Sequence, residues 1–238
     1  MNHIKMIQQF LDEKRNFEDL PEYGFPFITI SRQAGAGAHL LSYVILTEFL
    51  KHTDSELLQG WHVFDRTLCE VVAKDPRLQD SMETLVSEKY HSEFRDFIDS
   101  LFNDQSTQYM TYKTTFKIVR MLALIGKVIV VGRCSSLVTA DLSQAVHIRL
   151  VAPERQRIVW MMKRFKLNKE DARQAVIKQD ADRRKLVKLF FQRDIEDPLL
   201  YDIVWNTGRI EMDQITHAVL DLVQQRAAAR SRQRGVEL

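Results

Sequence analysis

Cysteine is scarce in this sequence. Only two of the 238 residues, Cys69 and Cys134, are cysteines. Two cysteines make neither a disulfide scaffold nor a zinc site. Histidine supplies no metal site either, because its candidate ligands do not show the spacing of zinc ligands. These candidates are His39, His62, His91 and His147. The sequence therefore predicts no metal site built from protein ligands.

Long apolar runs and an excess of one charge are also missing. No stretch reaches the length of a membrane span. The N-terminal segment MNHIKMIQQFLDEKRNF mixes apolar and charged residues and lacks the small-residue cleavage site of a secretory signal. The net charge is +2, from 34 basic and 32 acidic side chains, so bulk charge does not suggest general polyanion binding. We expect a cytoplasmic protein with no membrane partner and no specific nucleic-acid partner.

Strand-like and helical patterns alternate along the chain. Hydrophobic residues make up 45% of the sequence, which is ample for the core of one globular domain. Strands are expected at residues 27–30, 61–65, 127–132, 145–152 and 202–207. Helical patterns occupy residues 4–18, 40–50, 67–125, 153–190 and 211–228. The alternation predicts an α/β fold of three layers, with helices on both faces of a parallel sheet of about five strands.

Polar or glycine-rich features follow four of the predicted strands. A glycine turn follows the first strand and Asp65 ends the second, while Gly132 and Arg133 come at the end of the third. Asn206 and Thr207 end the last strand. Ligands of parallel sheets bind beyond the carboxyl ends of the strands. We therefore expect these features to converge on one site.

The turn AGAGAH, residues 34–39, lies where a phosphate-binding loop is expected. Gly35 and Gly37 permit backbone conformations with positive φ and close approach of a ligand. Successive N–H groups at the start of a helix bind anions. A plain strand-to-helix turn is the alternative, but the position after the first strand of an α/β domain favours the phosphate loop.

This turn lacks the side chains that normally complete a phosphate loop, a lysine and a hydroxyl residue. With the second glycine of the pattern placed at Gly37, Ala38 stands at the lysine position and His39 or Leu40 at the hydroxyl position. A charge-assisted hydrogen bond contributes roughly 1.5–3 kcal/mol, so its loss weakens binding by about one to two orders of magnitude. Arg32 could supply the missing cation, or it could be a surface arginine.

Two side chains at strand ends, and a set of basic residues further along the chain, are of types that bind or transfer phosphate groups. Arg133 could recognise phosphate through both arms of its guanidinium, or pair with a nearby carboxylate. Asp65 could contact a substrate, act as a base, hold metal-bound water or cap a helix. Each basic residue between 153 and 195 could bind phosphate or lie on a solvated face. These residues include Arg155, Arg157, Lys163, Arg164, Arg183, Arg184 and Arg193.

Six stretches, taken in order, carry a family resemblance. They are ITISRQAGAG, FD, VIVVGRCSS, HIRLVAPERQRIVWMMKRF, DADRRK and DPLLYDIVWNT. Over roughly residues 26–225 the chain resembles the cytidylate kinase-like family of P-loop nucleoside monophosphate kinases. It departs from true cytidylate kinases at Ala38, Leu40 and Cys134, where those enzymes have lysine, threonine and aspartate.

The resemblance implies a P-loop kinase fold with a helical lid and acceptor subdomain. Residues 1–25 would be an N-terminal helical extension, which either packs on the domain edge or docks a partner. Residues 26–228 would form the kinase-like domain, with a helical acceptor-side insert at 67–125 and a lid region at 153–195. Residues 229–238 would be a basic tail.

The resemblance also implies roles for single residues, with ATP and Mg²⁺ as cofactors and a nucleotide donor and acceptor as partners. The donor phosphates would be held by Arg32, Gln33, Ala34, Gly35, Ala36, Gly37, Ala38 and Arg157. The acceptor would be bound by Asp65, Arg133 and Asp182. Arg183, Arg184 and Asp65 would be catalytic.

Three functions remain open at this point. The first is ATP-dependent phosphoryl transfer to a nucleoside monophosphate such as CMP. The second is a degenerate nucleotide-binding domain with little or no kinase activity and a regulatory or interaction role, which Ala38, Leu40 and Cys134 favour. The third is an interaction module that uses the N-terminal helix and binds no nucleotide. The oligomeric state is open as well.

Overall fold

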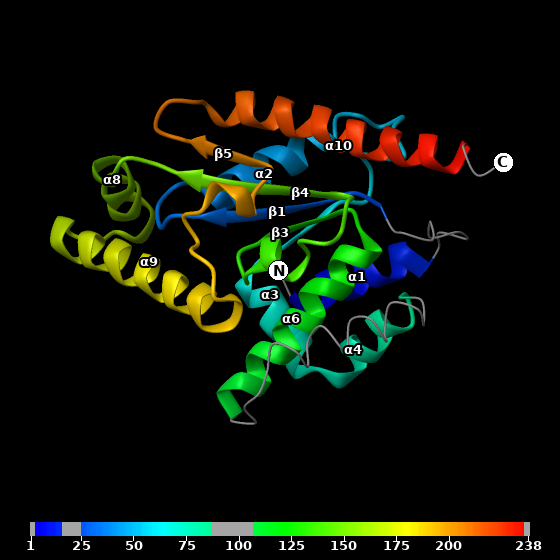
Figure 1. Ribbon diagram of the computed structural model, residues 1–238, viewed down its shortest axis with the longest axis horizontal. Coiled ribbons are helices and arrows are strands. Elements are labelled where there is room, and N and C mark those ends of the chain that lie inside the picture. Colours follow the sequence, from blue (N-terminus) through cyan, green and yellow to red (C-terminus); the bar gives the residue numbers. More distant parts are fainter. Residues whose placement is uncertain (1–2, 16–24, 87–106, 236–238) are drawn as a thin grey trace.

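Five parallel strands form a single sheet at the centre of the protein (Figure 1). The computed structural model describes residues 3–15, 25–86 and 107–235. The strands are β1 (Phe27–Arg32), β2 (His62–Phe64), β3 (Val128–Val131), β4 (Ala145–Val151) and β5 (Ile203–Asn206). Their order in the sheet is β2-β3-β1-β4-β5. This architecture confirms the predicted parallel α/β sheet, and it places β1, with the glycine turn that follows it, in the middle.

Helices cover both faces of the sheet and complete the three layers (Figure 1). One face carries α2 (Ala38–Phe49) and α10 (Met212–Gly235). The other carries α1 (His3–Arg15), α3 (Arg66–Lys74), α4 (Pro76–Glu83), α6 (Thr107–Ile125) and α7 (Ser135–Val138). Parts of the predicted helices at 4–18 and 67–125 fall outside the described residues. Within the described ranges, no helix is both long and apolar enough to cross a membrane.

The apolar sequence of β3 follows from its position between the two helical layers. All four of its residues are buried. Ile129 and Val131 join the core beneath α2 and α10, while Val128 and Val130 join the core on the opposite face. A strand covered on both faces has no solvent side, so its sequence is continuously apolar rather than alternating.

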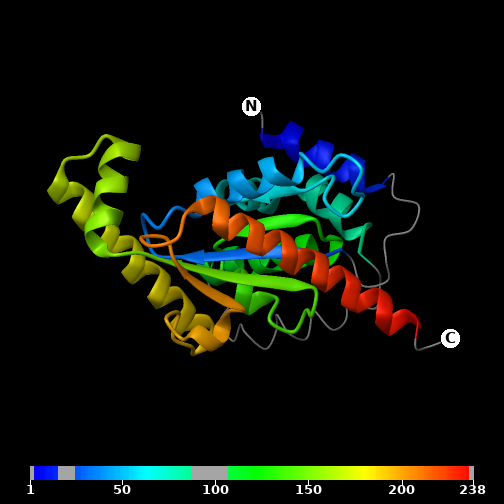
Figure 2. The ribbon, with the colours of Figure 1, turned by 90° about the horizontal axis from the view of Figure 1, so that it is seen from above.

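A helical hairpin stands at the edge of the sheet to which the strands point (Figures 1 and 2). It consists of α8 (Glu154–Phe165) and α9 (Lys169–Phe191), and a short 3-10 helix, η1 (Pro198–Leu200), follows it. The predicted helical stretch 153–190 is thus two helices. Lys166, with φ 54°, ends α8, and the Asn168 side chain caps α9 by accepting a hydrogen bond from the amide of Asp171. This break lets α9 fold back towards the glycine turn.

Helix α1 packs on the domain, one of the two alternatives given for it, and α10 runs further than expected. Helix α1 buries Ile7, Phe10 and Leu11 in the same core as α3 and α6, so its apolar face is used within the domain. Helix α10 continues to Gly235, beyond the expected end at residue 228. The segment RAAAR supports this extension because alanine and arginine are strong helix formers.

Lys14, near the end of α1, is fully buried at the base of the sheet. Its Nζ donates a hydrogen bond to the carbonyl oxygen of Gly60, 3.1 Å away. Burial, together with the neighbouring charge of Lys127, lowers the pKa of Lys14 to about 7. Between that pH and the ordinary lysine pKa, the unfolded chain binds a proton that the folded protein does not. Stability must therefore rise with pH in this window.

We expect the free energy of unfolding to increase between pH 7 and pH 9, with Lys14 contributing about 1 kcal/mol per pH unit. The increase ends near pH 9. Burial raises the pKa of the Cys69 and Cys134 thiols to about 12, so above pH 9 the unfolded chain loses thiol protons that the folded protein keeps, and this favours unfolding. Urea denaturation across the pH series measures the effect. The Lys14→Met variant should show a clearly shallower slope, and an unchanged slope would refute the assignment to Lys14.

Candidate functional site

The turn after β1 has the backbone conformation that its glycines suggested. Gly35 and Gly37 have φ values of 80° and 87°, in the left-handed region. A Cβ at Gly35 would lie 2.6 Å from the carbonyl oxygen of Arg157, and one at Gly37 would lie 2.5 Å from the Met212 side chain. Both positions therefore require glycine for conformation and for space. The turn is held tightly between α8 and the start of α10.

Four amide groups of this turn are unused donors. The N–H groups of Gly35, Gly37, Ala38 and His39 make no hydrogen bond to any residue that the structure describes. The last two belong to the first turn of α2, and Gly37 provides no side-chain cap. Unpaired amides at a helix start carry partial positive charge and attract anions. The loop thus has the donors of an anion site.

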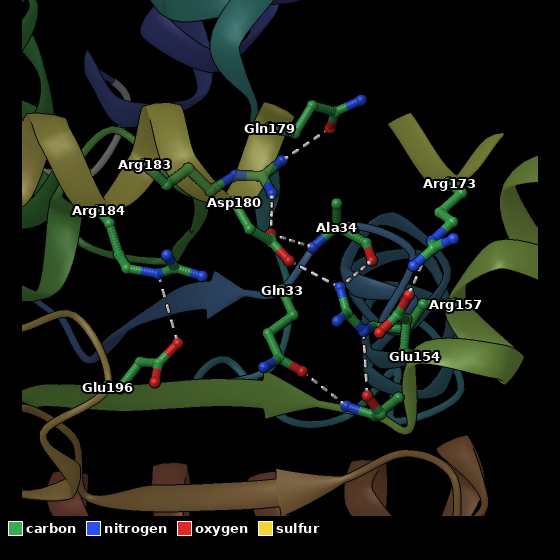
Figure 3. A network of polar contacts seen from close by, with 11 residues as sticks. Gln33, Ala34, Glu154, Arg157, Arg173, Gln179, Asp180, Arg183, Arg184 and Glu196 are labelled. Atoms are coloured by element: carbon green, nitrogen blue, oxygen red, sulfur yellow. Dashed lines mark hydrogen bonds and ion pairs between the residues drawn. The ribbon is translucent and has the colours of Figure 1, made fainter. Parts of the chain in front are cut away.

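A fifth amide of the loop already binds a carboxylate (Figure 3). The N–H of Ala34 donates to Oδ1 of Asp180 on α9, at 2.7 Å. Arg157 Nη1 donates to the other oxygen of this carboxylate, at 2.6 Å, and Arg183 Nη1 donates to Oδ1, at 3.0 Å. The loop, α8 and α9 are therefore joined through a single carboxylate.

Two predicted phosphate-binding residues shape the loop by contacting backbone atoms. Arg157 donates from Nε to the carbonyl oxygen of Ala152, at 3.0 Å, and from Nη1 to that of Ala34, at 3.1 Å. The Oε1 atom of Gln33 accepts a hydrogen bond from the amide of Ala152, at 3.1 Å. Arg157 is largely buried. Both side chains tie the loop to the segment after β4, and the structure brings both to the predicted site.

Arg32 extends from the end of β1 across the glycine that follows β3. A Cβ at Gly132 would overlap Nη1 of Arg32. The Arg32 side chain is partly buried and makes neither a hydrogen bond nor an ion pair with any described residue. Burial, then the charges of Arg183 and Arg133, lower its pKa to about 9, so the guanidinium remains charged at neutral pH. A charged and unpaired arginine beside the loop is suited to receive an anion.

We expect Gly132→Ala to damage both stability and ligand binding. Gly132 has φ 82°, and a side chain there costs roughly 1–2 kcal/mol in backbone strain. The added methyl group must also displace Arg32. Gly60→Ala is the matched control, because Gly60 has φ 71° but its Cβ would make only ordinary van der Waals contacts, the nearest with Lys14 Nζ at 3.7 Å. Urea denaturation should show a loss of stability in both variants, whereas calorimetry with ATP should show weaker binding only for Gly132→Ala. Equal ATP affinities would exclude the proposed contact.

The backbone after β3 is strained. Gly132 is followed by Arg133 and Cys134, with φ values of 59° and 54°, so three consecutive residues are left-handed. Such strain in residues other than glycine concentrates at functional sites. Arg133 lies 3.7 Å from Oε1 of Glu70, a loose ion pair. Burial raises the pKa of the Cys134 thiol to about 12, which keeps it neutral and poorly nucleophilic.

Asp65 is a helix cap. Its Oδ1 accepts hydrogen bonds from the amides of Thr67 and Leu68, at 2.9 and 3.1 Å, at the start of α3. Its second oxygen makes no hydrogen bond to a described residue. The negative charge of Asp65 offsets part of the lowering of the Arg32 pKa that burial causes, which places Asp65 in the same charged neighbourhood. The cap is one of the alternatives that the sequence left open, and it leaves one oxygen available to a ligand.

The remaining predicted residues on α9 do not reach the loop. Arg184 is largely exposed, and its Nε lies 3.5 Å from Oε1 of Glu196 (Figure 3). Asp182 is also exposed. Consecutive residues on a helix point about 100° apart, and here Arg183 turns towards Asp180 while Arg184 turns towards Glu196. The structure brings Arg183 to the loop but not Arg184 or Asp182.

Two residues at the site were missed from the sequence, Asp180 and Arg149. Arg149 on β4 is buried, donates to Oγ of Ser31 at 3.0 Å and lies 5.5 Å from the ring centre of Tyr201. It forms no ion pair with a described residue. Arg149 did give a signal, because an arginine inside the apolar run AVHIRLVA is unusual for a buried parallel strand.

The inward position of Asp180 could have been found from the spacing of the apolar residues in α9. Residues that face the core recur every three or four positions on a helix. Asp180 and Arg183 fill two places of one such stripe, so both face inwards. The other members of the stripe are the buried residues Ala172, Val176, Val187 and Phe190.

A small cavity of about 120 Å³ adjoins the loop on the side of β5 and α10. Leu40, Trp160 and Met212 give it apolar walls, and the loop itself forms its floor. Thr207, another wall residue, donates from Oγ1 to the carbonyl oxygen of Ala36, at 3.1 Å. The feature predicted at the end of the last strand thus does join the site. Among the described residues, no group of three histidine, cysteine or acidic side chains is placed to hold a metal ion.

A sequence model of the cytidylate kinase-like family matches residues 27–209. The chain belongs to the cytidylate kinase-like family. This confirms the resemblance drawn from the sequence motifs. The match begins at the first residue of β1 and covers all five strands, the loop and the α8–α9 hairpin. Helices α1 and α10 lie outside it.

One solved structure supports the fold of this cytidylate kinase-like protein. The crystal structure of an uncharacterized protein from Eubacterium ventriosum ATCC 27560 matches with a TM-score of 0.62 and 19% identity, covering 84% of this chain and 98% of that one. The crystal structure of TT1252 from Thermus thermophilus gives a TM-score of 0.43 and 15% identity, covering 83% and 97%. No curated protein matches the sequence. The first structure supports the three-layer fold alone.

Proposed function

We propose that this cytidylate kinase-like protein transfers the γ-phosphoryl group of ATP to a nucleoside monophosphate such as CMP. The observation that carries the proposal is the glycine loop, which has four unused amides and a fifth already bound to the Asp180 carboxylate. A phosphate group offers the same negative charge and more acceptor oxygens. A loop that binds a carboxylate in this way is suited to binding the donor phosphates.

The reaction forms a bond from an acceptor phosphate oxygen to the γ-phosphorus and breaks the bond from that phosphorus to the β-phosphate oxygen, releasing ADP. Catalysis of this kind depends on positioning and on neutralising charge. Arg32 and Arg183 lie beside the loop, where the γ-phosphate would be, and Arg133 lies at the end of β3, where the acceptor phosphate would be. The apolar cavity beside the loop suits the base of the donor.

Mg²⁺ fits this site only in part. The hydroxyl that normally meets the ion in a phosphate loop is missing, because His39 or Leu40 stands there. Mg²⁺ commonly binds through substrate phosphates, water and one or two carboxylates. The free oxygen of Asp65 is the carboxylate that the site offers for metal-bound water. The ion would supply charge neutralisation on the phosphates, while the arginines and amides hold the nucleotide.

Transfer can be tested directly with the purified full-length chain. Incubation with ATP, Mg²⁺ and each of several nucleoside monophosphates should give ADP and a nucleoside diphosphate, which chromatography separates. An Arg183→Gln preparation, purified in the same way, excludes a contaminating kinase as the source of turnover. Failure to phosphorylate any acceptor, by folded protein that binds ATP, would contradict the proposal.

A degenerate nucleotide-binding domain is the second candidate. Ala38, Leu40 and Cys134 favour it, because they stand where true cytidylate kinases have lysine, threonine and aspartate. In that case, ATP should raise the melting temperature while no acceptor is phosphorylated. A cytoplasmic location suits both candidates, since their nucleotide ligands are found there.

A further inference from the structure

We propose that Asp180 is an internal occupant of the phosphate loop, and that a phosphate group entering the loop displaces its carboxylate. The inference rests on the proposed function to the extent that the loop binds phosphate. It adds that the empty protein is held closed by one of its own acidic side chains. Nucleotide binding then exchanges a protein anion for a ligand anion.

The geometry around Asp180 is that of an anion in a receptor. Oδ1 accepts a hydrogen bond from the loop amide of Ala34 and another from Arg183, while Oδ2 accepts from Arg157. An amide and two guanidinium groups are the donors that commonly bind phosphate. The carboxylate is only 11% exposed, so solvent screens these contacts weakly. Asp180 therefore fills the place that a phosphate oxygen would take.

The carboxylate and a phosphate cannot share these donors. The Ala34 amide has a single hydrogen, and both guanidinium groups already point at Asp180 (Figure 3). Two anions held side by side at low solvent exposure also repel each other by several kcal/mol. A phosphate at Ala34 must therefore move Asp180 away, and with it the middle of α9. The contacts of Arg157 and Arg183 then become available to the ligand.

This exchange has two opposite consequences. In the empty protein, Asp180 stabilises the packing of α9 on the loop. During binding, it competes with the ligand and weakens the affinity for phosphate. Removal of the carboxylate should thus lower the melting temperature yet tighten phosphate binding. A purely structural role for Asp180 predicts losses in both measurements, so the two readouts separate the alternatives.

Calorimetric titration of the full chain with inorganic tripolyphosphate, and separately with ATP, tests the exchange. For Asp180→Asn, we expect the Kd to fall about tenfold, a change of about 1.4 kcal/mol. Glu154→Gln is the matched control because it removes the same charge from the α8–α9 hairpin without touching the contacts of Asp180. Glu154 pairs with Arg173 at 3.6 Å and makes no hydrogen bond or ion pair with the loop (Figure 3). Its Kd should stay within about twofold of the wild type.

The outcomes distinguish this inference from the proposed function. If the wild type binds tripolyphosphate and Asp180→Asn binds it equally or more weakly, the exchange is wrong while the phosphate loop stands. The same holds if Glu154→Gln tightens binding as much as Asp180→Asn does. If no variant binds tripolyphosphate or ATP, the loop is not a phosphate site and both proposals fail. Should Asp180→Asn not fold, Asp180→Ala removes the same carboxylate and serves the same test.

Discussion

Replacement of Arg32 by glutamine is expected to lower kcat/KM for ATP about 100-fold, the loss of one or two charge-assisted hydrogen bonds. The loop has no lysine, since Ala38 takes its position, so the cation beside the phosphates must come from elsewhere. Arg32 lies at the end of the central strand with its guanidinium unpaired among the described residues. Glutamine keeps much of the length and hydrogen-bonding capacity of the side chain but removes its charge.

Steady-state kinetics with a saturating acceptor measures this loss. Arg173→Gln is a suitable control because Arg173 is exposed and pairs only loosely with Glu154, at 3.6 Å. We expect it to change kcat/KM by less than about twofold. An Arg32→Gln enzyme as active as the wild type would show that Arg32 does not replace the lysine. The loop would then act through its amides alone.

Arg183→Gln is expected to lower kcat by at least about 100-fold, because arginines that neutralise a transferring phosphoryl group commonly contribute 10³-fold or more. Arg184→Gln should lower it by no more than about threefold. The two side chains are neighbours in sequence and were given the same role from the sequence. The structure separates them, since Arg183 reaches the carboxylate on the loop and Arg184 reaches Glu196 on the surface.

Single-turnover kinetics should be used for this pair, because they report the transfer step without product release. Both variants lose one positive charge from α9. A difference in kcat between them therefore cannot come from the change in net charge. Similar losses in both would mean that α9 turns or shifts when nucleotide binds. A larger loss in Arg184→Gln would overturn the assignment to Arg183.

The fold could be predicted from the sequence because its signals are local. Parallel strands buried on both faces read as continuous apolar runs, and VIVV in β3 is one of them. Gly35 and Gly37 marked the tight turn after β1 because only glycine adopts their backbone conformation freely. The ends of the helices were less predictable. The break at Lys166 and the continuation of α10 to Gly235 depend on capping and packing that no periodic pattern shows.

The composition of the site could be predicted only in part. Asp65, Arg133 and Arg32 were identified because each follows a strand, and strand ends of a parallel sheet converge. Asp180 was missed because it lies in a helix whose sequence is charged on most of its surface. Its inward direction emerges once Ala172 and Val176 are known to be buried. Arg149 was missed because the sequence of β4 was identified as a strand from its apolar residues, and the arginine among them was given no role.

The sequence by itself determined the succession of strands and helices along the chain, the position of the glycine loop after β1 and the family. These follow from periodicity and from short motifs, each contained in a few neighbouring residues. Only the tertiary structure decided which side chains fill the loop. Ala34 and Asp180 are 146 residues apart and meet because α9 folds back across the carboxyl edge of the sheet. The rotation of α9 about its own axis then selects Arg183 and leaves Arg184 in solvent.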